Sequence, residues 1–360
     1  MIRKGLMLGT ASILTAMFVY WGTASGAKDC GGIPAERVAD MVHAVIESHR
    51  TFYTVHVVER LQAKGVVVAA ENWQTTNTLP LPVQLLQESA RLAVNTPAKI
   101  GYKLIGLWPI NKQNGPKTEF EQKGLVETLQ NPYRPYTEVV KHGGDSYLQA
   151  MYADRAVSQS CIGCHNAHPD SPKQNFKQKD VMGAIMVTVP LSQKDCGSEV
   201  PAERVADMVH AVIESHRTFY TVHVVERLQA KGVVVAAENW QTTNTLPLPV
   251  QLLQESARLA VNTPAKIGYK LIGLWPINKQ NGPKTEFEQK GLVETLQNPY
   301  RPYTEVVKHG GDSYLQAMYA DRAVSQSCIG CHNAHPDSPK RNFKQKDVMG
   351  AIMITVPLNQ

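Results

Sequence analysis

Residues 136–168 read YTEVVKHGGDSYLQAMYADRAVSQSCIGCHNAH, and the same stretch recurs at 303–335. Two segments with β-branched and aromatic residues, Tyr136–Lys141 and Asp145–Ala153, flank His142-Gly143-Gly144. Such a glycine pair between two strand-like segments is typical of a tight turn that joins antiparallel strands. The stretch therefore predicts a β-hairpin, followed by a short segment that ends in a Cys-x-x-Cys-His motif.

The recurrence extends far beyond this stretch. Residues 34–193 match residues 201–360 at a constant offset. The positions that differ are Gln174 against Arg341, Val187 against Ile354, and Ser192 against Asn359. A unit of about 160 residues can bury roughly 70% of its unfolded surface, so each copy is expected to fold alone. We predict a tandem duplication with domains at 28–193 and 194–360.

The rest of one unit predicts an α+β fold. A long N-terminal helix is expected at 34–64, because Pro34 suits a first helical turn and Gly65 ends the apolar 3.6-residue pattern. Further along the chain the pattern predicts helices at 83–95, 117–130 and 157–165, and strands at 100–108 and 181–189. Together with the hairpin, these elements indicate an antiparallel sheet and exclude the small all-helical cytochrome c fold.

The Cys-x-x-Cys-His motif is the attachment signature of c-type haem. Its two thiols form thioethers to the porphyrin edge, and the adjacent imidazole binds iron as the proximal ligand. We therefore expect two covalently attached haem c groups. The cysteines are Cys161, Cys164, Cys328 and Cys331, and the proximal ligands are His165 and His332.

Two other interpretations of the motif are weaker. A structural zinc site usually needs four ligands, and neither unit has a second cysteine pair. A thioredoxin-like dithiol is expected beside a βαβ pattern, which is absent here.

The sequence does not determine which residue is the second axial ligand. His49 and His56 are placed by the helical pattern on the buried face of the first helix, but seven residues span about 10.5 Å, so both cannot bind one iron. We prefer His56, with His223 as its counterpart. Either histidine is alternatively a core residue with a hydrogen-bonded neighbour. The further candidates are Met151, Met182, Met186, Cys30 and an open site.

The N-terminus predicts export. Arg3 and Lys4 precede an apolar stretch, and small residues end it at Ser25-Gly26-Ala27, so residues 1–27 are interpreted as a cleaved signal peptide. The competing interpretation is an uncleaved anchor at residues 5–24. Either way we expect a periplasmic or other extracytoplasmic location, where the two remaining cysteines, Cys30 and Cys196, pair as a disulfide, ligate haem or stay free.

Charge and composition exclude some partners. The formal net charge is +6, two of the basic residues lie in the leader, and four haem propionates would bring the remainder close to neutral. No basic stripe with interleaved aromatic residues is present, so we expect no nucleic acid partner. The sequence also lacks the spacing of hydrolytic carboxylate pairs, nucleophile–base arrangements and glycine-rich phosphate loops.

An ordered set of motifs carries a family resemblance. The set comprises HRTFY at 49–53, VVERL at 57–61, Trp73, LPLP at 79–82, LWPIN at 107–111, CIGCHN at 161–166 and DVMG at 180–183. It resembles the PAS-like c-type haem domain family, long catalogued as a domain of unknown function and found alone or as extracytoplasmic sensor domains. The resemblance implies a PAS-like antiparallel sheet with covalent haem in its pocket.

Three functional hypotheses follow. The first is an exported dihaem cytochrome that transfers electrons to a redox partner protein. The second is a redox or diatomic-gas sensor that acts through a separate membrane signalling partner, because no receptor or kinase segment follows in this sequence. The third, a haem enzyme such as a peroxidase, requires an open iron site and a catalytic distal histidine, and nothing in the sequence demands either. We favour electron transfer, with sensing as the alternative.

Overall fold

The computed structural model describes residues 31–192, 195 and 198–359. Residues Gly31–Gln360 form one compact unit. The predictions for the signal peptide or anchor, for Cys30 and for Cys196 therefore concern residues outside the described ones.

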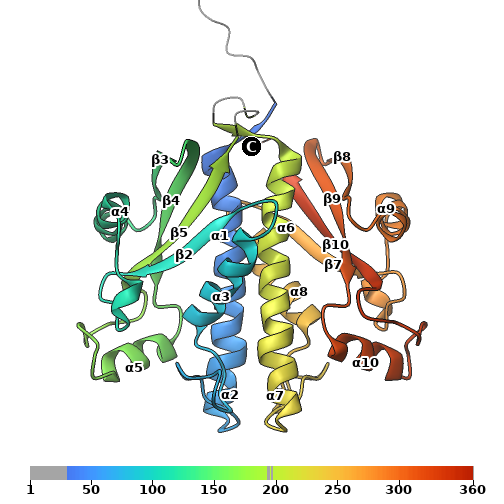
Figure 1. Ribbon diagram of the computed structural model, residues 1–360, viewed down its shortest axis with the longest axis horizontal. Coiled ribbons are helices and arrows are strands. Elements are labelled where there is room, and N and C mark those ends of the chain that lie inside the picture. Colours follow the sequence, from blue (N-terminus) through green and yellow to red (C-terminus); the bar gives the residue numbers. More distant parts are fainter. Residues whose placement is uncertain (1–30, 193–194, 196–197, 360) are drawn as a thin grey trace, which may run out of the picture. The chain divides into compact units, whose positions relative to one another are not determined.

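Each half contains the same succession of elements (Figure 1). The first half comprises β1 (Ile33–Pro34), α1 (Ala35–Phe52), the π-helix η1 (Tyr53–Glu59), α2 (Arg60–Ala63), α3 (Pro82–Val94), β2 (Gly101–Gly106), η2 (Lys112–Asn114), α4 (Glu119–Gln130), β3 (Tyr136–His142), β4 (Asp145–Arg155), α5 (Gln159–Ala167) and β5 (Val181–Leu191). The second half comprises β6 (Glu199–Val200), α6 (Ala202–Phe219), η3 (Tyr220–Glu226), α7 (Arg227–Ala230), α8 (Pro249–Val261), β7 (Gly268–Gly273), η4 (Lys279–Asn281), α9 (Glu286–Gln297), β8 (Tyr303–His309), β9 (Asp312–Arg322), α10 (Gln326–Ala334) and β10 (Val348–Pro357).

The predicted α+β fold is confirmed. Each half has a four-stranded sheet, in the order β2-β5-β4-β3 or β7-β10-β9-β8, and all neighbouring strands are antiparallel. The expected hairpin is β3–β4, whose turn uses Gly143 and Gly144, both with positive φ, a conformation that glycine adopts without strain. The long N-terminal helix is also present, as the continuous run of α1, η1 and α2.

A change of helix type in that run alters which residues are buried. The segment Tyr53–Glu59 is a π-helix, whose i→i+5 hydrogen bonds wind the chain more slowly than an α-helix does. A seven-residue spacing that stays on one face of an α-helix consequently rotates off that face here. His49 is 1% exposed, as predicted, but His56 lies on the exposed side, so its placement on the buried face was wrong.

The two sides of each sheet are covered by different helices. On one side α4 packs against the sheet through Phe120 and Leu125, which form a small core with Met151 and Met186. On the other side lies the helical run, and Tyr152 of β4 donates a hydrogen bond to Asp40 Oδ1 of α1 at 2.7 Å.

The halves share their main cores. One cluster combines apolar residues of α1 and the first sheet with those of α6 and the second sheet, and another combines residues around both π-helices. Figure 1 shows α1 and α6 side by side between the two sheets. We expected each half to bury its core alone; instead, two of the clusters span both halves. The estimate from chain length predicts how much surface one unit can bury. It does not predict whether a helix face is buried within its own half or against the other half.

A close approach in the sheet gives a stability prediction. A Cβ atom on Gly183 of β5 would lie 2.2 Å from the carbonyl oxygen of Ile105 in β2. We expect Gly183→Ala to lower the free energy of unfolding by about 2–3 kcal/mol, because backbone has to shift to make room. Urea denaturation measures this loss.

The matched control is Gly163→Ala, since a Cβ there meets nothing within 4 Å and alanine favours the helix. A Gly183→Ala protein as stable as this control would contradict the close contact of β2 with β5.

Candidate cofactor cavity

Each half contains a cavity beside the Cys-x-x-Cys-His helix. Its volume is about 410 Å³ in the first half and about 430 Å³ in the second, and equivalent residues line both. The helical run supplies one wall through residues spaced four apart, which matches the slow winding of the π-helix. These residues are Arg50, Thr54, Val58 and Gln62. The other walls come from the loop that leads into α3, the 104–114 segment, α5, and the ends of β4 and β5.

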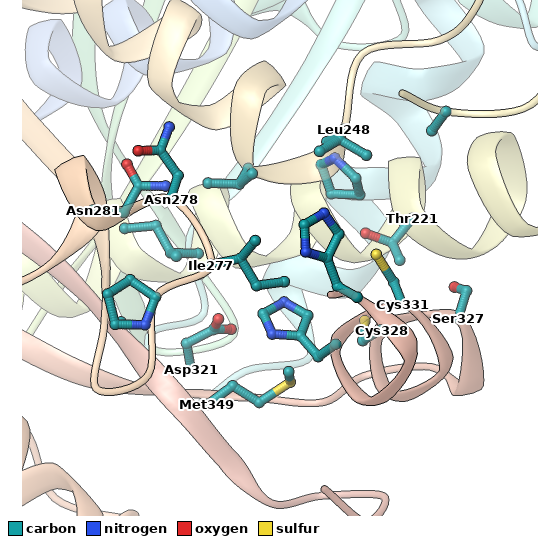
Figure 2. A pocket seen from close by; sticks show the side chains of 18 of the residues that line it. Thr221, Leu248, Ile277, Asn278, Asn281, Asp321, Ser327, Cys328, Cys331 and Met349 are labelled. Atoms are coloured by element: carbon teal, nitrogen blue, oxygen red, sulfur yellow. The ribbon is translucent and has the colours of Figure 1, made fainter. Parts of the chain in front are cut away.

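All three chemically active residues of the motif meet in this cavity. Cys161, Cys164 and His165 line it together, because spacings of three and four residues place them on one face of α5. The helix ends at Ala167, one residue before His168, whose N–H donates to the Cys164 carbonyl at 3.0 Å. Figure 2 shows the counterparts Cys328 and Cys331 on α10 at the second cavity.

The environment of His165 favours a neutral imidazole. Burial lowers its pKa from the ordinary value, and the nearby His168 lowers it further. Its Nδ1 atom is buried and has no hydrogen-bond partner among the described residues, and the Phe176 ring meets the imidazole edge-on at 5.7 Å. Neutral imidazole is the form that binds a metal. The same orphan nitrogen recurs at His332.

A buried ion pair faces the cavity. Arg50 Nη2 lies 2.5 Å from Asp154 Oδ1 and 3.1 Å from Glu47 Oε2, and the arginine and the aspartate are 5% and 7% exposed. Burial raises the pKa of Asp154 to about 6, although Arg50 acts in the opposite direction. The second half repeats this pair with Arg217 and Asp321.

The preferred distal histidines lie away from the cavities. His56 does not line the first cavity; it packs against Phe52 and against Trp240 of the other half, with ring centroids 4.9 Å and 5.7 Å away. His223 packs in the same way against Trp73. Neither histidine that was predicted as a distal ligand therefore lines a cavity, because the π-helix rotates the helix face on which both were placed.

His49 is not in the cavity either. Its ring lies 4.9 Å from that of His216, between the two halves, where the Nε2 atom of His216 shares a 3.1 Å hydrogen bond with the Tyr102 hydroxyl. His49 is therefore the hydrogen-bonded core residue of the alternative interpretation, because its Nδ1 lies 2.9 Å from the Val45 carbonyl.

Of the three candidate methionines, one lines the cavity and two do not. Met151 and Met186 belong to the core under α4, whereas Met182 of β5 lines the cavity and packs beside Cys161. His168 also lines the cavity. Besides His165, the imidazole and thioether groups lining the first cavity are thus those of His168 and Met182. Their counterparts are His335 and Met349, and Figure 2 shows Met349 among the side chains that line the second cavity.

One finding bears on the zinc interpretation. Within the described residues, no cluster of three or more histidine, cysteine or acidic residues is arranged to hold a metal ion on its own, which gives no support to a structural zinc site. None of the helices in the described ranges combines the length and apolar character needed to cross a bilayer.

Neither the ion pair nor most of the cavity wall was predicted from the sequence. One signal was available, because Arg50 directly follows His49 and lies next to the apolar stripe of the first helix, and a buried charged residue requires a partner. No sequence signal pointed to Asp154 as that partner.

Comparison with known proteins gives a family. The model of the Tll0287-like family, described as Tll0287, matches residues 34–190 and again residues 196–357. The chain therefore belongs to the Tll0287-like family and contains two tandem copies of its domain. Neither the curated proteins nor the solved structures contain a match.

Proposed function

We propose that this chain is an exported dihaem c-type cytochrome with one covalent haem in each cavity, and that it transfers electrons. The observation that carries the proposal is that both cysteines and the histidine of each motif line one cavity. We also propose that the four-stranded sheet is PAS-like and that the protein acts in the periplasm or another extracytoplasmic compartment with a redox partner protein.

The residues present fit a haem. The cavity offers two thiols for thioether bonds, a neutral imidazole with a buried unpartnered nitrogen, and apolar wall residues such as Trp108 and Ile110. A bound haem would supply a one-electron iron couple, whose potential depends on its axial ligands, burial and nearby charges. His165 would hold the iron, and Met182 and His168 are the other residues lining the cavity whose side chains could bind it. The Arg50–Asp154 pair would set the nearby charge.

The first test is haem content. Replacing Cys161 and Cys164 by serine is expected to reduce covalently bound haem from about two groups to about one per chain, since the other half keeps its motif. The pyridine haemochrome assay on purified holoprotein measures this number. Replacing Cys328 and Cys331 is the matched variant and should have the same effect. A wild-type protein without covalent haem would refute the proposal.

The second test concerns the role of the haem. An electron carrier whose iron is fully ligated by the protein is expected to have a low-spin ferrous spectrum that does not change under carbon monoxide. Met182→Leu should convert the first haem to a form that binds the gas if the thioether is its ligand. Met151→Leu serves as the control, because Met151 lies outside the cavity.

Sensing is the second candidate function, and one observation favours it. The wall formed by the helical run carries Thr54 and Val58, which are not strong iron ligands, beside the polar Arg50–Asp154 pair. An iron left open on that side would bind a diatomic gas, with a membrane signalling protein as partner. A wild-type ferrous spectrum that shifts under carbon monoxide would favour sensing over electron transfer.

A further inference from the structure

An arginine of each half binds the backbone of the other half. Arg60 of α2 donates from Nη1 to the carbonyl oxygens of Trp240 and Thr243, both at 3.0 Å, and from Nη2 to that of Thr245. Its guanidinium also lies 5.1 Å from the centre of the Trp240 ring. Three carbonyl groups of one loop are thus held by a single planar side chain, which suits the forked geometry of arginine.

The reciprocal contact is present. Arg227 of α7 donates to the carbonyl oxygens of Trp73 and Thr76 at 3.0 Å and to that of Thr78, and its guanidinium lies 5.1 Å from the centre of the Trp73 ring. The two contacts are equivalent under exchange of the halves, as in an isologous interface.

The loops held in this way form walls of the cavities. In the second half, Ala236, Ala237 and Glu238 precede the bound carbonyls, Leu248 and Pro249 follow them, and all five residues line the cavity. Apart from one bridge between Ala236 and Leu246, this loop makes no strand pairing of its own. Hydrogen bonds within the loop, such as those from Thr242 N and Thr243 Oγ1 to the Asn239 carbonyl, satisfy part of its backbone. The carbonyl groups of Trp240, Thr243 and Thr245 are bound by Arg60 of the other half.

Further contacts across the halves act on the same loop. The Trp240 side chain is 5% exposed and meets the ring of Phe52 edge-on at 5.7 Å. Lys64 Nζ donates to the Thr243 carbonyl at 3.2 Å. The helical run of the first half, whose other face lines the first cavity, thereby supports the wall of the second cavity.

We propose that Arg60 is a positioning residue for the second cavity and Arg227 for the first, so that each cofactor site is completed by the opposite half. The spectroscopic consequence rests on the proposed haem, but the ordering of the loop does not. Loss of an arginine should loosen the wall of the opposite cavity and leave the cavity beside it in the same half unchanged.

The experiment uses a chain with a single haem. Replacing Cys328 and Cys331 by serine leaves haem only in the first half, and Arg227→Gln or Arg60→Gln is then added to this background. We expect Arg227→Gln to shift the reduction potential of the remaining haem and to raise the rate at which added imidazole reaches its iron about tenfold or more, because charged hydrogen bonds are lost from the wall. Arg60→Gln should leave the reduction potential of this haem unchanged and the rate of imidazole binding within about twofold of its original value.

A crossed pair provides the internal control. In the chain that keeps only the second haem, the effects of the two variants should exchange. Arg227→Lys separates charge from geometry, because lysine keeps the charge but cannot bind three carbonyls in a fork, so its effect should be close to that of glutamine. Equal effects of Arg60→Gln and Arg227→Gln on one haem would overturn the proposal.

A measurement without haem keeps the two proposals separate. In the full chain, Arg227→Gln should raise amide hydrogen exchange about tenfold in residues 73–78 and leave residues 240–245 unchanged, and Arg60→Gln should do the reverse. This result is expected even if the chain binds no haem. Unchanged exchange in both loops would refute the positioning role while leaving the cofactor proposal intact.

Discussion

Lowering the pH from 7 to 5 is expected to reduce the free energy of unfolding of this chain by several kcal/mol. The cause is a set of histidines held neutral beside or between the two helical runs. Burial lowers the pKa of His43 and of His49 to about 4, that of His210 to about 3, and that of His216 well below its ordinary value. His49 and His216 are each only 1% exposed.

The direction follows from proton linkage. A histidine with a folded pKa below its unfolded value binds its proton in the unfolded chain first, so its stabilising contribution is lost as the pH falls below about 6.5. Between 6.5 and 5 this amounts to about 2 kcal/mol for each fully buried histidine. Asp154 and Asp321, whose pKa values are raised by burial, gain protons when folded and offset part of the loss.

Urea denaturation at pH 7, 6 and 5 measures the effect. The double variant His49→Gln/His216→Gln should remove about 4 kcal/mol of the pH-dependent loss, since it deletes two of the four titrating groups. The double variant His142→Gln/His309→Gln is the control, because both side chains are exposed on hairpin strands. An unchanged pH dependence in the first variant would show that these histidines are not held neutral in the core.

Arg50→Met is expected to lower the free energy of unfolding by about 3–5 kcal/mol at pH 7. The substitution leaves Asp154 buried without its cation, 7% exposed and close to Glu47, and an uncompensated buried charge is costly. Arg217→Met should have a similar effect through Asp321 in the second half.

The pH dependence of this loss distinguishes an electrostatic cause from a packing defect. Removing Arg50 raises the pKa of Asp154 further, and a raised folded pKa gives stability that is present at low pH and lost as the pH rises. The difference between variant and wild type should therefore shrink from pH 7 towards pH 5.

The double variant Arg50→Met/Asp154→Leu should recover most of the stability, because an apolar pair of similar volume replaces a buried ion pair at little cost. If the double variant were as unstable as Arg50→Met, the loss would come from packing and not from the unpaired charge.

Local signals were sufficient to predict the elements of the fold. Each predicted helix and strand has a counterpart within a few residues, because glycine and proline mark the ends: Gly65 follows the helical run and Gly143-Gly144 forms the turn of β3–β4. The antiparallel arrangement followed from the short hairpin, since a two-residue turn does not allow parallel strands.

Local sequence patterns placed some of the predicted iron ligands at the cavity and others away from it. The motif residues were expected to meet in one place, and Cys161, Cys164 and His165 do line one cavity because their spacing is that of one helix face. His56 was placed by extending an α-helical period through a segment that is a π-helix. The apolar pattern does not report the number of residues in a turn, so the sequence carried no warning of this rotation.

The contacts between the halves could not be predicted from the sequence either. Arg60 and the carbonyl groups that it binds are about 180 residues apart, and backbone acceptors leave no residue signature. The repeat predicted two equal domains, but whether they share a core depends on which face of α1 meets α6.

The reciprocal contacts of Arg60 and Arg227 join two halves of one chain, which determines how the interface responds to dilution of the protein. Two separate copies of this domain would form the same interface only as far as their concentration allowed. In one chain the second copy is held near the first at an effective concentration that, for short linkers, is in the millimolar range. The midpoint of unfolding should therefore not depend on protein concentration, and both cavity walls should stay assembled at any dilution at which the chain is folded.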